Sequence, residues 1–155
     1  MRFLGRARVC ETLASQGLRL TDFAALDMTL RGVAAFEDPE KALIGADVVL
    51  VAVKSGDTGD IARLIRNHAP HAQVISLQNG VGNADALRVA LPGADVRAAM
   101  VPFNVVWRGD GHYHRATSGD IVVEAGPLPH LDTPTLAWTQ SDQIEAVQWG
   151  KLLIN

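Results

Sequence analysis

A short apolar run that leads directly into a polar, glycine-rich turn is the feature that most restricts the fold of this chain. Residues Val74–Leu77 predict a buried strand, and residues 78–82, Gln-Asn-Gly-Val-Gly, predict a turn whose glycines allow close backbone approach. A helical pattern follows at once over 84–91. Strand, tight turn and helix in this order predict a parallel α/β sheet, in which ligands bind at the carboxyl ends of strands.

A second unit of the same kind precedes this one. Asp47–Val53 predicts a strand, the turn 54–56 follows, and acidic residues then open a helix. Right-handed crossovers would make the two strands adjacent and parallel, which puts Lys54 and Asn79 at one rim as candidate phosphate or ribose contacts. A solvated loop lysine and a turn asparagine are an equally good interpretation, because asparagine is common in turns.

Turn and capping residues divide the remaining sequence into short elements. Asp38-Pro39 is typical of a helix start, Gly17 of a helix end, and Asp142 with Glu145 of a capping box. In the first part of the chain we expect a helix over 6–16, a small hairpin or paired strands of 18–21 and 28–31, a strand over 33–36 and a helix from 39 to 44. In the later part we expect a strand over 96–106 broken near Pro102, a hairpin turn at 108–111, strands over 112–115 and 120–124, a loop over 126–134 and a final helix through 154.

Composition restricts the class of protein. A chain of 155 residues predicts one domain, and a net charge of −3 without a long basic run argues against a nucleic-acid surface. Cys10 is the only cysteine, so an intramolecular disulfide is impossible, which agrees with a reducing compartment. No apolar run approaches the roughly 20 residues of a membrane span. We therefore expect a cytoplasmic protein.

Several familiar catalytic motifs are missing from the sequence. No G-x-G-x-x-G occurs: Gly80-Val81-Gly82 begins like one, but Asp85 stands at the third glycine position, so we interpret the run as a turn. The histidine pairs, 112 with 114 and 68 with 71, have no third ligand at a suggestive spacing, so we expect no metal site. No serine nucleophile motif is present.

Two positions on the final helix could act on one substrate atom. Lys151 and Asn155 lie four residues apart and share a helical face, so an ammonium and a carboxamide could both donate to a carbonyl oxygen that becomes an alkoxide. By spacing alone, a surface lysine near a helix end is the better interpretation. The same holds for Arg6, which follows a strand end but is otherwise an ordinary helix-start charge.

Taken together, four segments of the sequence resemble the ketopantoate reductase (2-dehydropantoate 2-reductase) family. They are Asp47–Ser55, Gln78–Asn83, Phe103-Asn104 with His114-Arg115, and Trp149–Asn155. The resemblance implies a Rossmann-type NAD(P)-binding domain, with Lys54 and Asn79 contacting NADP(H) and Arg6 reading its 2′-phosphate. It further implies Lys151 as proton donor to a small keto acid and Asn155 as a substrate contact.

The chain also departs from the family pattern at both ends. The family's first strand with its glycine-rich loop, and its C-terminal helical domain, have no counterpart here. The resemblance therefore implies that 1–140 is a partial Rossmann-like domain and 141–155 the start of an interdomain helix. We expect the chain alone to bind NADPH poorly and to be inactive, whereas the intact enzyme would reduce ketopantoate to pantoate, as a possible homodimer. The alternatives are a non-catalytic nucleotide-binding or interaction module and a reductase of another 2-keto acid.

Overall fold

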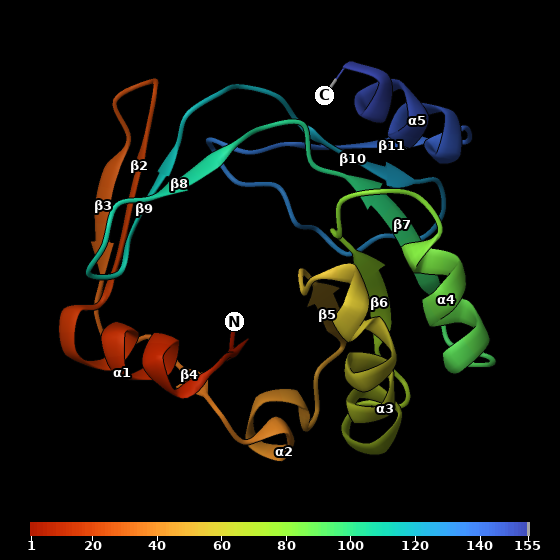
Figure 1. Cartoon of the computed structure of the whole chain (residues 1–155), viewed down its shortest axis with the longest axis horizontal. Coiled ribbons are helices and arrows are strands. Elements are labelled where there is room, and N and C mark those ends of the chain that lie inside the picture. Colours follow the sequence, from red (N-terminus) through yellow and green to blue (C-terminus); the bar gives the residue numbers. More distant parts are fainter. Residues whose placement is uncertain (155) are drawn as a thin grey trace. The chain divides into compact units, whose positions relative to one another are not determined.

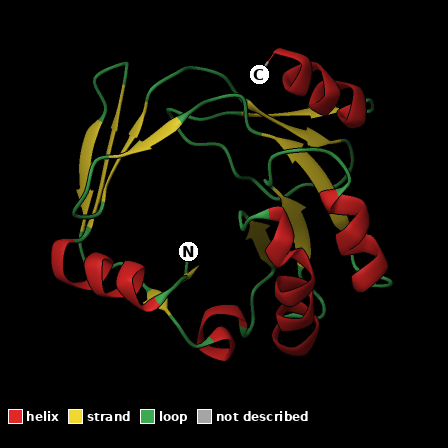
Figure 2. Cartoon of the chain, viewed as in Figure 1, coloured by secondary structure: helices red, strands yellow, loops and turns green. Residues whose placement is uncertain are grey.

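The computed structural model describes residues 1–154, which divide into two compact units (Figure 1). The first unit contains 1–44 and 103–118, and the second contains 45–102 with the residues from 119 onward. Each unit has its own sheets and helices (Figure 2). Within the described residues no helix is long and apolar enough to cross a membrane. The predicted boundary at residue 140 stays a prediction.

A five-stranded sheet forms the centre of the second unit. Its strand order is β11-β10-β7-β6-β5, and β5, β6 and β7 are parallel. The predicted adjacency of the two apolar strands is confirmed, with Val49 paired to Val74 and Val51 to Ser76. The five strands are β5 (Val48–Val51), β6 (Gln73–Ser76), β7 (Val96–Met100), β10 (Ile121–Glu124) and β11 (Trp138–Ser141).

Helices that follow the parallel strands bury their apolar sides. After β5 comes a short 3-10 turn, η1 (Ser55–Asp57), which leads into α3 (Thr58–His68), and β6 is followed by α4 (Asn83–Ala90). Both helices supply fully buried side chains, and they pack together. The side chains with almost no exposure are Ile65 of α3, Leu87 of α4 and Val74 and Ile75 of β6. Burial on both faces explains why Val74 and Ile75, which point to opposite faces of the sheet, are both apolar.

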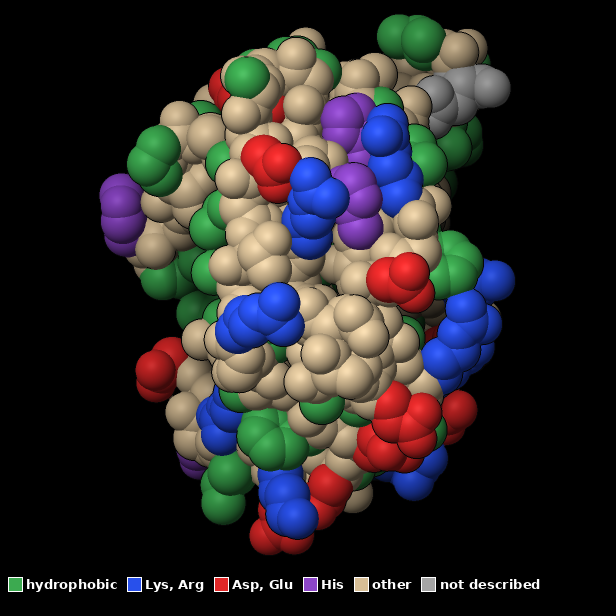
Figure 3. All heavy atoms as spheres, turned by 90° about the vertical axis from the view of Figure 1, so that its left-hand side faces the viewer, with side chains coloured by type: hydrophobic (Ala, Val, Ile, Leu, Met, Phe, Trp, Pro, Cys, Tyr) green, Lys and Arg blue, Asp and Glu red, His purple; other side chains and the backbone are tan. Residues whose placement is uncertain are grey.

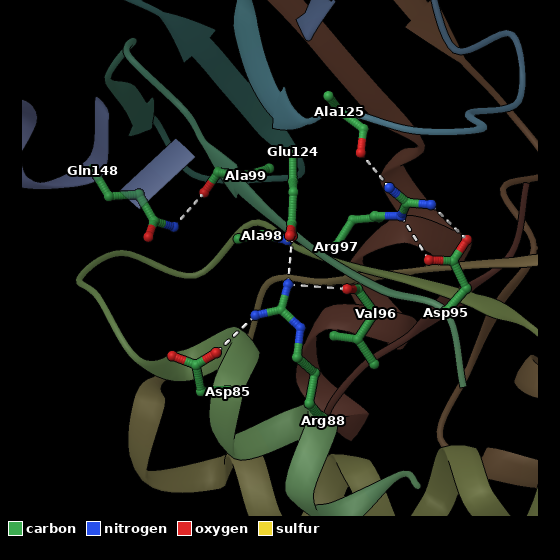
Figure 4. Close-up of polar contacts among 10 residues, drawn as sticks. All are labelled: Asp85, Arg88, Asp95, Val96, Arg97, Ala98, Ala99, Glu124, Ala125 and Gln148. Carbon is green, nitrogen blue, oxygen red and sulfur yellow. Dashed lines mark hydrogen bonds and ion pairs between the residues drawn. The ribbon is translucent and has the colours of Figure 1, made fainter. Parts of the chain in front are cut away.

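A charged contact ties α4 to the neighbouring strands (Figure 4). Arg88 pairs with Asp85 at 2.7 Å and also with Glu124 of β10, and it donates to the carbonyl of Val96 at 3.2 Å. The same Glu124 oxygen accepts the backbone N–H of Ala98 at 3.0 Å. The carboxylate therefore completes the hydrogen bonding of β7 and holds a helix at the same time.

The first unit contains two smaller sheets. One has four strands in the order β3-β2-β9-β8, with the predicted hairpin of β2 and β3, and the other pairs β1 with β4 in parallel. The strands are β1 (Phe3–Leu4), β2 (Leu18–Asp22), β3 (Asp27–Leu30), β4 (Ala35–Phe36), β8 (Val105–Trp107) and β9 (His112–Arg115), and the helices are α1 (Ala7–Gln16) and α2 (Pro39–Leu43).

Local sequence signals act at the helix ends of this unit as predicted. Asp38 accepts the N–H of Glu40 at 3.0 Å at the start of α2. Gly17 ends α1 with φ of 81°, and a Cβ there would lie 2.6 Å from the carbonyl oxygen of Leu30, so glycine is required.

The structure differs from the sequence prediction in two places. The strand expected over 96–106 is two strands in different sheets, because the chain leaves β7 before Pro102 and enters β8 after it. A strand not expected, β11, pairs in parallel with β10 directly after the long loop. The final helix, α5 (Ile144–Ile154), begins beyond Ser141, whose hydroxyl accepts the N–H of Gln143 at 3.1 Å.

Candidate functional site

The predicted residues Lys54 and Asn79 both follow carboxyl ends of neighbouring parallel strands. β5 ends at Val51 and β6 at Ser76, and each predicted residue is the third after its strand. Both side chains are exposed. Because these strands run in the same direction, the two turns lie at the same edge of the sheet, where α/β folds bind ligands.

Asn79 is joined there by the predicted catalytic lysine. The ammonium Nζ of Lys151 donates to the carboxamide Oδ1 of Asn79 at 2.7 Å, across 72 positions of sequence. Lys151 is half-buried, and this burial lowers the pKa of its amine below the ordinary value of 10.5. From their spacing in the sequence, we expected Lys151 to act together with Asn155, which lies outside the described residues. In the structure, Lys151 bonds Asn79.

The position of Lys151 depends on how α5 lies on the sheet. α5 packs against β7 and β10, with Ile144 buried at its first turn. One turn before the lysine, Gln148 donates from Nε2 to the carbonyl oxygen of Ala99 in β7 at 3.0 Å (Figure 4). Sequence reasoning missed Gln148. Its position three residues before Lys151, on the same helical face, is the signal that could have identified it.

The turn that carries Asn79 is held by its own neighbours. Asn83 donates from Nδ2 to the backbone carbonyl of Asn79 at 2.9 Å. Gly80 and Gly82 have φ of 92° and 81°, which only glycine adopts without strain, so the chain can turn directly into α4. Gln78 is buried although it is polar, and it bonds Thr58 of α3 and Ser76 at the end of β6. The sequence motif contained Gln78 but gave no reason to assign it a role.

Arg6 lies in the first unit, where β1 is followed by α1. Its backbone is extended at the N-cap of the helix, and its side chain is exposed. Its carbonyl accepts the N–H groups of Val9 and Cys10, at 2.8 and 3.1 Å. An exposed guanidinium just after a strand end is where such folds hold the 2′-phosphate of NADP, but its role stays a prediction.

The histidines of β9 are bonded within their own sheet. The hydroxyl of Thr21 lies 2.8 Å from both His112 Nε2 and His114 Nδ1. Burial, together with the positive charges of Arg19 and Arg108, lowers the pKa of His112. Histidine and basic side chains lie next to one another on the face drawn in Figure 3. Among the described residues no group of three His, Cys, Asp or Glu side chains could hold a metal ion.

Comparison with known proteins decides the family. The sequence model of the ketopantoate reductase family PanE/ApbA matches residues 1–127, most of the chain. This chain belongs to the ketopantoate reductase family. A curated 2-dehydropantoate 2-reductase of Halobacterium salinarum is 28% identical over an alignment of 120 residues, and the match covers 71% of this chain and 40% of that protein.

Solved structures of the family share the fold. The PanE/ApbA family ketopantoate reductase of Ralstonia eutropha is 33% identical, with a TM-score of 0.81 over 97% of this chain and 51% of its own. The 2-dehydropantoate 2-reductase of Geobacter metallireducens is 26% identical, with a TM-score of 0.82 over 99% of this chain and 54% of its own. The chain spans about half the length of these relatives. It has the Rossmann-like α/β fold of their N-terminal domain, in a family of NAD(P)-dependent oxidoreductases.

Proposed function

We propose that this protein supplies the cofactor-side half of an NADPH-dependent reduction of 2-dehydropantoate to pantoate, a step toward pantothenate and coenzyme A. The observation that carries the proposal is the hydrogen bond between Lys151 and Asn79. It joins the residue predicted to protonate the substrate to a residue predicted to contact the cofactor.

The residues at the sheet edge fit a dinucleotide cofactor in their chemistry. Lys54 offers a cation and Asn79 a carboxamide, and both are exposed after adjacent strands. Donors of these kinds suit phosphate and ribose oxygens. Arg6 is the residue proposed to bind the 2′-phosphate, which would favour NADPH over NADH. When bound, the nicotinamide cofactor supplies the hydride for the keto carbon.

The protein's own part in the reaction is the proton. Lys151 carries three N–H bonds, and one of them is directed to Asn79. Among the described residues the other two have no acceptor, and we propose that they donate to the substrate's keto oxygen, which becomes negative as the hydride arrives. Burial favours loss of the lysine proton, so transfer to this oxygen is easier than from a fully solvated amine. Asn155 is proposed as an additional donor to the substrate.

A chimera tests the proposal directly. This chain would replace the matching half of the Ralstonia eutropha relative, and the purified chimera would be assayed with NADPH or NADH and a panel of 2-keto acids. We expect turnover with NADPH and 2-dehydropantoate. Preference for a different keto acid would support the alternative of a reductase with another substrate. A folded chimera that oxidises neither cofactor would contradict the proposal and favour a non-catalytic nucleotide-binding module.

Two further expectations concern the cellular setting. The reaction uses soluble small molecules, so we propose a cytoplasmic enzyme whose partners are its cofactor and a keto acid. A homodimer is the assembly proposed for the complete enzyme. Light scattering of the chimera, compared with its sequence mass, measures this assembly.

A further inference from the structure

Gln78 is a buried polar residue at the edge of the sheet that the proposed chemistry leaves without a role. Its exposed fraction is 5%, and it lies between strand β6 and Asn79. We propose that Gln78 is a positioning residue that holds the two strand-end turns in register, so that Lys54 and Asn79 face the cofactor together. This inference rests on the proposed function.

The side chain of Gln78 connects both turns through a chain of hydrogen bonds. Its Nε2 donates to the hydroxyl of Thr58 at 2.9 Å, and this hydroxyl donates to the carbonyl oxygen of Ser55 at 2.8 Å. At the other end, the hydroxyl of Ser76 donates to Gln78 Oε1 at 3.2 Å. Thr58 and Ser76 are also buried, so water cannot easily replace these bonds.

The direction of each bond follows from counting protons. A hydroxyl has one proton to donate, and Thr58 uses it on Ser55, so its oxygen must accept from Gln78. Ser76 uses its proton on the other end of the same amide. Position 78 therefore needs a donor and an acceptor on one planar group. A carboxamide provides both, whereas an ionised carboxylate or an apolar side chain does not.

Two members of this chain of bonds, Ser55 and Gln78, directly neighbour the residues proposed to bind the cofactor. Ser55 follows Lys54 directly, and the carbonyl of Lys54 accepts the N–H of Asp57 at 2.9 Å in the same short turn. On the other side, Asn79 follows Gln78 directly and is held again by Asn83. A shift of Gln78 would thus move the carboxamide that receives the Lys151 ammonium. Positioning of this kind affects cofactor binding and proton transfer together.

The kinetic test uses four variants of the chimera. Thr58→Val removes the hydroxyl with almost no change of shape, and Gln78→Leu removes the amide. We expect each to raise the KM for NADPH and lower kcat by about tenfold, in the range expected for an unpaired buried polar group. The double variant should be little worse than either single one, because both break one chain. Thr58→Ser keeps the hydroxyl and should restore both constants to near the unsubstituted values.

The matched control is Gln73→Leu. Gln73 lies at the opposite end of the same strand, where it bonds Asp95 at 2.7 Å and the carbonyl of Pro127 at 2.8 Å. The Gln73→Leu variant should have a lower melting temperature but an unchanged KM for NADPH and an unchanged kcat. Simple addition of the Thr58→Val and Gln78→Leu effects, or equal kinetic losses in Gln73→Leu, would overturn the proposal.

A second measurement on the chain itself separates this inference from the proposed function. Amide hydrogen exchange followed by NMR reports on both turns without substrate. In Thr58→Val, which removes a hydroxyl at the start of α3, exchange should also accelerate at the N–H of Leu77, which directly precedes Gln78 and donates to the carbonyl of Val51 at 2.8 Å. Unchanged exchange there would refute the coupling. If the unsubstituted chimera reduces no keto acid, the proposed function fails, and the exchange data still decide the role of Gln78.

Discussion

The three lysines of the chain give a contrast at the scale of single residues. Lys151→Ala in the chimera should lower kcat about 100- to 1,000-fold with little change in NADPH affinity, because it removes a donor to the developing alkoxide. Lys54→Ala should instead raise the KM for NADPH by roughly tenfold or more, with a smaller effect on saturated turnover. Lys41→Ala, at an exposed position of α2, is the control. Steady-state kinetics measure all three, and a near-normal kcat without Lys151 would remove it from catalysis.

The lowered pKa of Lys151 predicts a pH dependence with a definite sign. Its proton is lost as pH rises, so kcat should fall on an alkaline limb centred below 10.5, the value of an ordinary lysine. Stability changes the other way: the folded state disfavours the charged amine, so this cost disappears as pH rises from the folded to the unfolded pKa. A kcat–pH profile measures the limb. Lys151→Arg should abolish the alkaline limb of this profile. If the limb is unchanged in that variant, another group is responsible for it.

At the scale of elements, the hairpin of β2 and β3 depends on one buried carboxylate. Asp22 accepts the N–H groups of Ala24 and Leu26, both at 2.8 Å, and pairs with Arg115 at 2.9 Å. These bonds, first that from Leu26, lower the pKa of Asp22 below 3.8, so its contribution to stability is present above that value and is lost as pH falls. Asp22→Asn should reduce the melting temperature, and the melting temperature of this variant should decrease less steeply as the pH falls. Asp27→Asn, on the same hairpin but in an exposed pair with Arg19, should change it much less.

The same scale explains what the sequence could and could not predict. Local signals sufficed for β6 and α4 and for the hairpin, because apolar periodicity and turn glycines act within a few residues. Strand β11 was not predicted, because Trp138–Ser141 has no strong strand pattern of its own. This strand forms by pairing with β10. The contact of Lys151 with Asn79 was also not predicted, because it depends on how α5 packs on the sheet and not on the spacing of residues in the sequence. The family resemblance identified Lys151 and Asn79 as site residues, but it did not predict that they form a hydrogen bond with each other.

At the scale of the whole molecule, the last turns of α5 leave apolar side chains exposed. Trp149 and Leu152 are partly exposed, and Leu153 and Ile154 are 84% and 88% exposed. Exposed apolar side chains gathered at one helix end promote association. The chain should therefore self-associate at high concentration and bind a hydrophobic dye, and Leu153→Glu with Ile154→Glu should reduce both. Val89→Glu changes an isolated apolar side chain of α4, 83% exposed, and serves as control. A monomer at high concentration without dye binding would contradict this prediction.

The tether between Lys151 and Asn79 also bears on the handedness of the product. The bond to the carboxamide holds the ammonium nitrogen at one place, so the keto oxygen that it binds is also held at one place. A keto group held there presents one face to the hydride donor, and the alcohol forms with one configuration. Loosening the tether with Asn79→Ala would let the lysine approach from both sides. Chiral chromatography of the pantoate formed would then find a mixed product, even where the rate is preserved.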